Sequence, residues 1–198
     1  MTVSEEMHFN ELLGGLAEVF AKEGRPGGEQ ASAALRRAQS GRYRRAASNS
    51  DPGTVLDAAV ALPGALPLAE QVLGVRNLLD WTSWAGEGLA PEVSANLFTA
   101  ELVGPDGHVA EKEVRVGLLV SRSFTDYPLS SHSGEETYFV LAGTAEWVLE
   151  GASYTEKPPG SFVHHPAWAR HGRRTLEQPF LGAWRWSGDL DLSSFSVS

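Results

Sequence analysis

The segment Ser130-Ser-His-Ser-Gly-Glu-Glu-Thr-Tyr138 places four polar side chains at even separations, and the apolar run Phe139-Val-Leu-Ala142 follows it. Successive side chains of a β-strand point to opposite faces of a sheet, so residues at even separations share a face. Ser130, His132, Glu136 and Tyr138 have one parity. If that face points into a barrel, a hydroxyl, an imidazole, a carboxylate and a phenol converge inside it.

An alternating pattern extends on both sides of this segment and predicts a β fold. Apolar residues alternate over 98–102, Gly104-Pro-Asp-Gly107 makes a turn, and the alternation returns over 114–120. Further strands are expected over 137–149, 161–165 and 179–186. Many short strands separated by Gly/Pro turns favour an antiparallel barrel or sandwich over a βαβ fold. We therefore predict a mainly β protein with a small antiparallel barrel over 95–190 and a peripheral Ser-rich tail over 191–198.

Residues 1–94 have helical periodicity instead. Apolar residues recur at helical spacing over 9–20, a second helix is expected from Glu29 to about Ala47, and a third from Leu66 to Leu79. We expect this N-terminal region to form a helical layer on the barrel. The second helix is rich in arginine, which we interpret as a solvated face or an oligomer contact rather than an anionic docking surface; the residues are Arg36, Arg37, Arg42, Arg44 and Arg45.

Composition narrows the class of protein. The chain has 198 residues, enough for one domain with an extra layer, and its net charge of -9 argues against a nucleic-acid binder. It has no cysteine, which excludes disulfides and thiolate metal sites and fits a reducing compartment. The acidic start lacks the features of a signal peptide, and no apolar run reaches membrane-spanning length. We expect a cytoplasmic protein that acts on a small molecule; a homodimer is compatible with the sequence.

A histidine about thirty residues later completes a candidate metal site. His171 follows Pro166 after four intervening residues, at the far side of one expected strand and a tight turn. Two imidazoles with a carboxylate and a phenolate suit Zn, Fe, Mn, Co or Ni and exclude a soft Cu(I) site. We predict His132, Glu136 and His171 as ligands of one divalent or trivalent ion, with Tyr138 as a further ligand or a base.

The other histidines are predicted to lie outside this site. His164 and His165 are adjacent, so at most one can face the barrel interior, and neither is predicted as a ligand. His8 and His108 lie near a terminus and in a turn, and both are expected at the surface.

Two motifs and their surroundings resemble known families. Glu136-x6-Gly143, and Pro158-x-Gly160 followed by His171, resemble the two motifs of the cupins, which are small β-barrels. More specifically, several segments over about 120–190 resemble the cupin-type dimethylsulfoniopropionate lyases; they are Tyr127-Pro128, the run Glu135–Trp147, Pro159-Gly160, His164-His-Pro166 and Trp184-x-Trp186-Ser-Gly-Asp-Leu190. The N-terminal half agrees with those enzymes only in general layout.

The resemblance implies a metal-dependent lyase that cleaves dimethylsulfoniopropionate into acrylate and dimethyl sulfide. It implies Tyr138 as the base that removes the α proton, and Tyr127 as a second tyrosine that positions the substrate or helps proton transfer. Trp184 and Trp186 would bind the sulfonium by cation–π attraction. Phe139 and Trp147 could do the same, and packing in the barrel core is an equally good interpretation of all four.

Ser130 departs from the family pattern, which begins His-x-His. A neutral hydroxyl is a weak ligand, so we expect lower metal affinity and activity that falls or shifts to another substrate. Two alternatives to the lyase therefore stay open. One is another metal-dependent cupin enzyme acting on a small carboxylate, and the other is a non-catalytic binding cupin.

Overall fold

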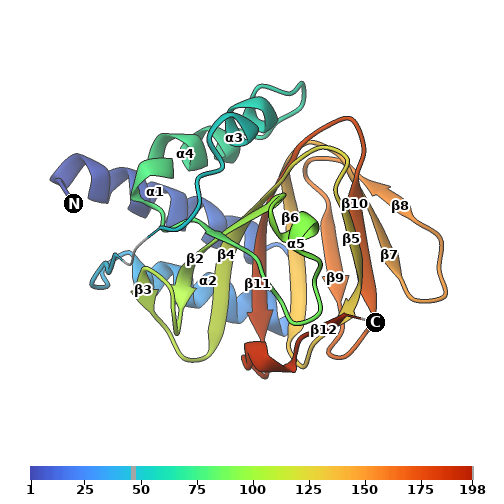
Figure 1. Cartoon of the computed structure of the whole chain (residues 1–198). Coiled ribbons are helices and arrows are strands. Elements are labelled where there is room, and N and C mark those ends of the chain that lie inside the picture. The colour runs from blue at the N-terminus through green and yellow to red at the C-terminus, as the bar shows by residue number, and fades with distance from the viewer. Residues whose placement is uncertain (46–47, 198) are drawn as a thin grey trace.

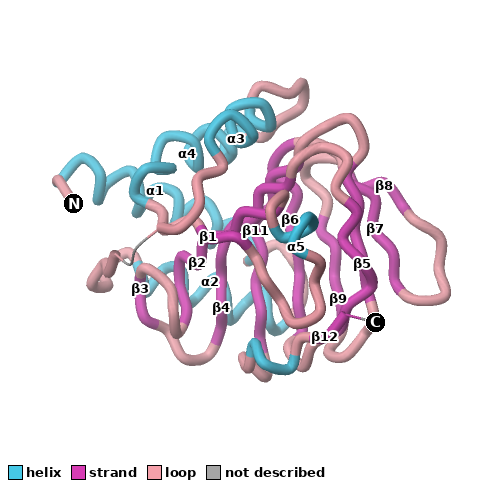
Figure 2. Tube along the Cα trace, viewed as in Figure 1, coloured by secondary structure: helices cyan, strands magenta, loops and turns pink. Residues whose placement is uncertain are grey.

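Two β-sheets face each other, and helices cover the outer face of the larger one (Figures 1 and 2). The computed structural model describes residues 1–45 and 48–197. The larger sheet has the order β1 (Thr82–Ser83), β2 (Leu97–Gly104), β4 (Val114–Ser121), β11 (Phe180–Ser187), β6 (Glu135–Ala142) and β9 (Phe162–His165), with β3 (Val109–Ala110) paired to β2. The smaller has the order β12 (Ser196–Val197), β5 (Asp126–Ser131), β10 (His171–Thr175), β7 (Ala145–Leu149) and β8 (Thr155–Lys157).

All of these pairings are antiparallel except that of β2 with β3, and most neighbours in a sheet are distant in the sequence. This arrangement confirms the predicted mainly β, jelly-roll-like class with an N-terminal helical layer.

The expected strand over 137–149 is two strands in different sheets, because Gly143 turns the chain between β6 and β7. Gly143 has φ +73°, and a Cβ atom there would lie 2.0 Å from the carbonyl oxygen of Pro179. Only glycine tolerates both the left-handed backbone and this close approach. The glycine of the first motif thus passes the chain from one sheet to the other.

The helices are α1 (Val3–Phe20), α2 (Pro26–Ala38), α3 (Gly53–Val60), α4 (Pro67–Val75) with the 3₁₀ turn η1 (Arg76–Leu78), α5 (Pro91–Ser94) and the 3₁₀ turn η2 (Leu192–Ser194). The predicted helices over 9–20 and 66–79 are confirmed by α1 and by α4 with η1. The structure adds α3 and α5, which the sequence did not predict. In the part of the chain that the structure describes, no helix is long and apolar enough to cross a membrane.

The second predicted helix ends at Ala38 rather than near residue 47, and residues 46–47 lie outside the described residues. After the helix the chain lies against the segment that precedes β3, where the backbone amide of Arg44 donates a hydrogen bond to the carbonyl oxygen of His108. Of the arginines, Arg36 pairs with Glu18 and Arg37 pairs with Glu111. These ion pairs agree with the interpretation of a solvated helix face.

The prediction that His108 is a surface residue is wrong. It is 3% exposed and stacks on Tyr43, with ring centroids 4.9 Å apart. Its Nδ1 lies 2.9 Å from the carbonyl oxygen of Arg44, and its Nε2 accepts from the amide of Asp80. Both ring nitrogens are satisfied by backbone groups, which is why this imidazole can be buried.

The C-terminal segment is more than a peripheral tail. Its last strand, β12, pairs with β5, and Phe195 is 3% exposed. The Phe195 ring packs edge-on against Trp84 at 5.4 Å and lines the cavity between the sheets.

Candidate metal centre

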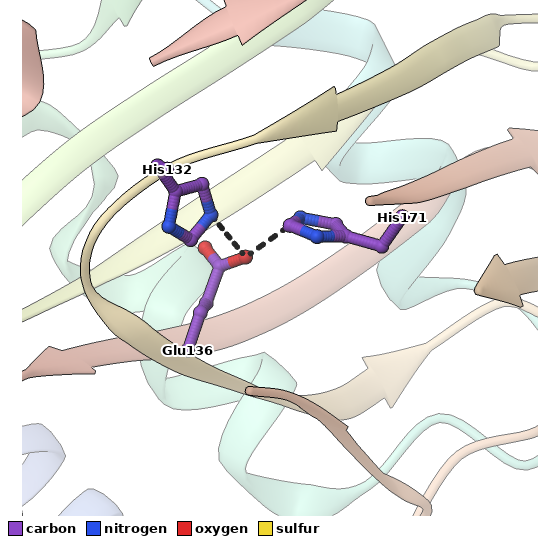
Figure 3. A group of neighbouring side chains, drawn as sticks. All are labelled: His132, Glu136 and His171. Carbon is purple, nitrogen blue, oxygen red and sulfur yellow. Dashed lines mark ion pairs between the residues drawn. The ribbon is translucent and has the colours of Figure 1, made fainter. Parts of the chain in front are cut away.

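His132, Glu136 and His171 meet between the two sheets (Figure 3). His132 lies in the turn between β5 and β6, Glu136 is on β6, and His171 begins β10. Their candidate ligand atoms all lie within 4.8 Å of one another, and the Nε2 atom of each histidine is 3.5 Å from Oε2 of Glu136. All three residues are buried. The structure thus brings together the three residues that the sequence predicted as ligands.

The hydrogen bonds of the two histidines leave a place for a cation. Nδ1 of His132 lies 3.0 Å from the carbonyl oxygen of Gly134, and Nδ1 of His171 lies 2.8 Å from that of Ala169. A carbonyl only accepts, so each Nδ1 carries a hydrogen, and a ring in its neutral form presents the lone pair of Nε2 to Glu136. Two lone pairs and a carboxylate facing one another need a positive charge between them, and the donor set therefore fits a transition-metal ion.

Trp186 on β11 orients this group. Its Nε1 donates a hydrogen bond of 2.7 Å to Oε1 of Glu136, and its ring stacks on His132. Burial alone would raise the pKa of Glu136, but the neighbouring imidazoles of His132, His165 and His171 outweigh burial and hold the pKa well below the usual range. The carboxylate is therefore ionised inside the protein, as a metal ligand must be.

His165 is a fourth group at this site. Its Nδ1 is 3.4 Å from Oε2 of Glu136, and its ring stacks on His171 at 3.8 Å. Burial lowers the pKa of His165 to about 4, in spite of the neighbouring carboxylate, so the ring is neutral at physiological pH. His164 faces the opposite way, toward Thr137, so the prediction that at most one of the pair faces inward agrees with the structure. The register of β9 with β6 brings His165 to this site, because it places His165 directly across from Glu136.

Both predicted tyrosines line the same cavity as the three clustered residues. Burial, then the charge of Glu136, raises the pKa of Tyr138 well above its ordinary value. A hydrogen bond with the Glu136 carboxylate also raises it, so the phenol lies beside the cluster. Burial raises the pKa of Tyr127 to about 12, and its hydroxyl accepts a hydrogen bond of 3.1 Å from Nε1 of Trp84.

The cavity has a volume of about 280 Å³ and is lined from both sheets. Trp184 and Trp186, the predicted substrate-binding tryptophans, both line it. They differ in their contacts, since Trp186 is committed to Glu136 and His132, whereas no ring contact or hydrogen bond joins the Trp184 indole to another described residue. The cavity is of a size for a small molecule.

A second group of acidic and histidine side chains, Glu23, Glu135 and His164, lies under the helices. The guanidinium of Arg185, which is fully buried, already pairs with Glu23 and lies 2.7 Å from Glu135. The positive charge that these carboxylates need is therefore supplied by the protein, and the group ties the turn between α1 and α2 to the sheet.

The facing sheets and the buried cluster of two histidines and one glutamate define a cupin with a candidate site for one metal ion. The family model of the dimethylsulfoniopropionate lyases matches residues 32–182, and the chain belongs to this family.

Individual relatives agree with this assignment. The dimethylsulfoniopropionate lyase DddQ of Ruegeria pomeroyi is 36% identical over 90 residues, which are 46% of this chain and 45% of that protein, so the matched part spans about half the length of the relative. The crystal structure of DddQ from Ruegeria pomeroyi superposes with a TM-score of 0.75 and 22% identity over 97% of this chain and 96% of that one. A structure described under the lyases RdDddP and RnDddQII also gives 0.75, with 23% identity and 98% of each chain covered. The fold is thus shared over nearly the whole chain.

Proposed function

We propose that this protein is a metal-dependent lyase that eliminates dimethyl sulfide from dimethylsulfoniopropionate and releases acrylate. The observation that carries the proposal is the cavity between the sheets of a chain from this family, in which the cluster around Glu136 and the phenols of Tyr127 and Tyr138 line one space. The substrate has a carboxylate at one end and a sulfonium on the β carbon, and the cavity offers groups suited to each.

His132, Glu136 and His171 would hold one ion of Zn, Fe, Mn, Co or Ni, and the tautomers of both histidines support this assignment. When bound, such an ion supplies a Lewis acid that stabilises negative charge on a carboxylate substrate and lowers the pKa of a neighbouring phenol. Ser130 takes no part in this set.

Tyr138 is the proposed base. It follows Glu136 by two residues on β6 and faces the same cavity. Ionised to the phenolate, its oxygen would take the proton from the α carbon, the electrons of that C–H bond would form the C=C bond of acrylate, and the C–S electron pair would leave with the sulfur as dimethyl sulfide. Tyr127, whose hydroxyl accepts a hydrogen bond from Nε1 of Trp84, would donate its own hydrogen to the substrate and so position it.

The proposal also includes the cellular location and the oligomeric state of the enzyme. A chain without cysteine suits a reducing compartment, and we place the enzyme in the cytoplasm. Cell fractionation tests this location, and light scattering of the purified protein tests the homodimer.

The test is an assay of metal-loaded protein with dimethylsulfoniopropionate, in which acrylate and dimethyl sulfide are both quantified. We expect equal amounts of the two products from the wild type, none from His171→Ala, and a large loss with retained metal in Tyr138→Phe. Wild-type acrylate no greater than that of His171→Ala sinks the proposal. Turnover of another small carboxylate would then indicate a different cupin enzyme, and failure to take up metal after reloading would indicate a binding cupin.

A further inference from the structure

Arg173 is a buried cation that lines the cavity next to the candidate metal centre. It follows His171 by two residues on β10, is 3% exposed, and contributes to the cavity wall. The adjacent Arg174 shows the contrast, because it faces the other way, pairs with Glu146 and lies over Tyr154 at 4.1 Å. Arg174 therefore lies on the outer surface, and Arg173 points into the cavity.

The surroundings of Arg173 are aromatic. Its Cζ atom lies over four rings at distances from 5.1 to 5.7 Å; the rings are those of Trp147, Phe180, Tyr127 and Tyr138. Ring faces attract a cation, but they satisfy none of the five N–H groups in the plane of the guanidinium. Among residues 1–45 and 48–197, the Arg173 side chain forms no hydrogen bond or ion pair.

A guanidinium that is taken out of bulk water is costly unless its N–H groups meet an acceptor, and an anion is the acceptor that compensates its charge best. Glu136, a buried carboxylate that lines the same cavity, is committed to His132, His171 and Trp186. The aromatic rings hold the guanidinium in place while its N–H groups stay available to the cavity. This arrangement prepares a site for an anion that comes from outside the chain.

We propose that Arg173 is the residue that binds the carboxylate of the substrate. A guanidinium presents two parallel N–H groups to the two oxygens of a carboxylate, which fixes both the position and the orientation of a small acid. The identity of that acid rests on the proposed function, whereas the class of ligand, a small carboxylate, rests on Arg173 itself.

The same contacts indicate where the opposite end of the substrate would bind. Because the charge of Arg173 lies over Tyr127, Tyr138 and Trp147, a sulfonium at those rings would be repelled. Trp184, on the facing sheet, lines the cavity and does not contact Arg173. A carboxylate at Arg173 and a sulfonium at Trp184 would place the two ends of the substrate against opposite walls.

The test compares propionate with its neutral amide, propionamide, as ligands of the metal-loaded protein. Calorimetry is carried out on the wild type, on Arg173→Met, and on Arg174→Met as the matched outward-facing control. We expect Arg173→Met to weaken propionate at least about 10-fold, the size of one lost charge-assisted hydrogen bond, and to change propionamide less than about twofold. Arg174→Met should match the wild type with both ligands, and metal content should be equal in all three proteins.

Propionate binding by folded Arg173→Met at the wild-type affinity overturns the proposal, and so does an equal loss for propionamide, which would indicate a structural role. If Arg173→Met does not fold, as judged by circular dichroism and Tm, Arg173→Gln takes its place with the same criteria. Acrylate assays run alongside separate the two proposals. Arg173-dependent binding of propionate by a wild type that makes no acrylate keeps the carboxylate site and rejects the lyase.

Discussion

Trp186 holds one oxygen of Glu136 with a hydrogen bond of 2.7 Å and leaves the other oxygen facing the histidines. The same indole stacks on His132, with ring centroids 4.0 Å apart and planes 26° apart. One side chain therefore orients two of the three candidate ligands, although it cannot bind a metal itself.

Replacing Trp186 with phenylalanine should weaken metal binding. The substitution keeps a ring for the stack on His132 and removes the donor to Glu136, so the carboxylate is free to rotate. Loss of such an outer partner typically costs about 10- to 100-fold in metal affinity. Competition with a chelator measures this, and Trp184→Phe is the matched control because Trp184 lines the cavity without a hydrogen bond to the cluster. Equal affinities in the two variants would show that the hydrogen bond does not matter.

Ser130 should limit metal binding because it lacks an imidazole. It is fully buried and pairs with His171 across the sheet, and its hydroxyl lies near the phenol of Tyr127 without the geometry of a hydrogen bond. We expect Ser130→His to tighten metal binding on the order of 10-fold, about 1.4 kcal/mol, and to raise the acrylate rate, because an imidazole adds a ligand where Ser130 supplies none. Ser130→Ala should leave metal affinity unchanged. Weaker metal binding in a folded Ser130→His protein would show that the position does not face the ion.

The sequence predicted His132 and Glu136 because their spacing is local, and His171 because it follows Gly160 after one strand and one tight turn. The alternating pattern does not predict that Tyr127 faces the cavity. Tyr127 is separated from Ser130 by an odd number of positions, so its side chain is expected on the opposite face of the strand. The structure has a register irregularity between β5 and β10 at this point, where Tyr127 pairs with Arg173 and Ser130 with His171. An extra residue in one strand changes the phase of the alternation, and an alternating pattern does not reveal it.

Other features depended on contacts between distant segments. Arg173 has the same parity as His171, but nothing in the sequence shows that its neighbour Arg174 has Glu146 as a partner and that Arg173 has none. The burial of Phe195 depends likewise on the pairing of β12 with β5. Strand alternation gives the face of a residue, and only the tertiary structure gives its partners.

Phe195 is expected to stabilise both the fold and the closed cavity. Its ring packs on Trp84 and against Gly86, where a Cβ atom would lie 2.3 Å from the ring. Truncating a buried phenylalanine typically costs about 3–5 kcal/mol, so Phe195→Ala should lower the free energy of unfolding by about that amount and raise the KM by opening the cavity. Urea denaturation and steady-state kinetics measure the two effects. Ser196→Ala, at an exposed position on β12, should stay within about 0.5 kcal/mol of the wild type, and a similarly small effect of Phe195→Ala would refute the role of the ring.

His108 should make stability depend on pH. Burial lowers its pKa in the folded protein, although the carbonyl of Arg44 and the charge of Asp80 oppose the shift. The unfolded chain, with a histidine pKa of about 6.5, therefore binds more protons than the folded chain in the window just below that value. The free energy of unfolding consequently rises with pH through this window, and the contribution is complete above about pH 7 and is lost as the pH falls toward the folded pKa.

The non-titrating variant His108→Gln isolates this contribution, because every other group titrates equally in both proteins. Urea midpoints between pH 5 and 8 should show a steeper dependence in the wild type, with a difference in slope of up to about 1.4 kcal/mol per pH unit. His8→Gln, which makes the same substitution at an exposed position of α1, is the matched control for the change of residue. Parallel curves for the wild type and His108→Gln would mean that the imidazole takes up a proton without leaving its buried position, as it could if Asp80, whose Oδ2 lies 3.5 Å from Nδ1, compensates the charge in full.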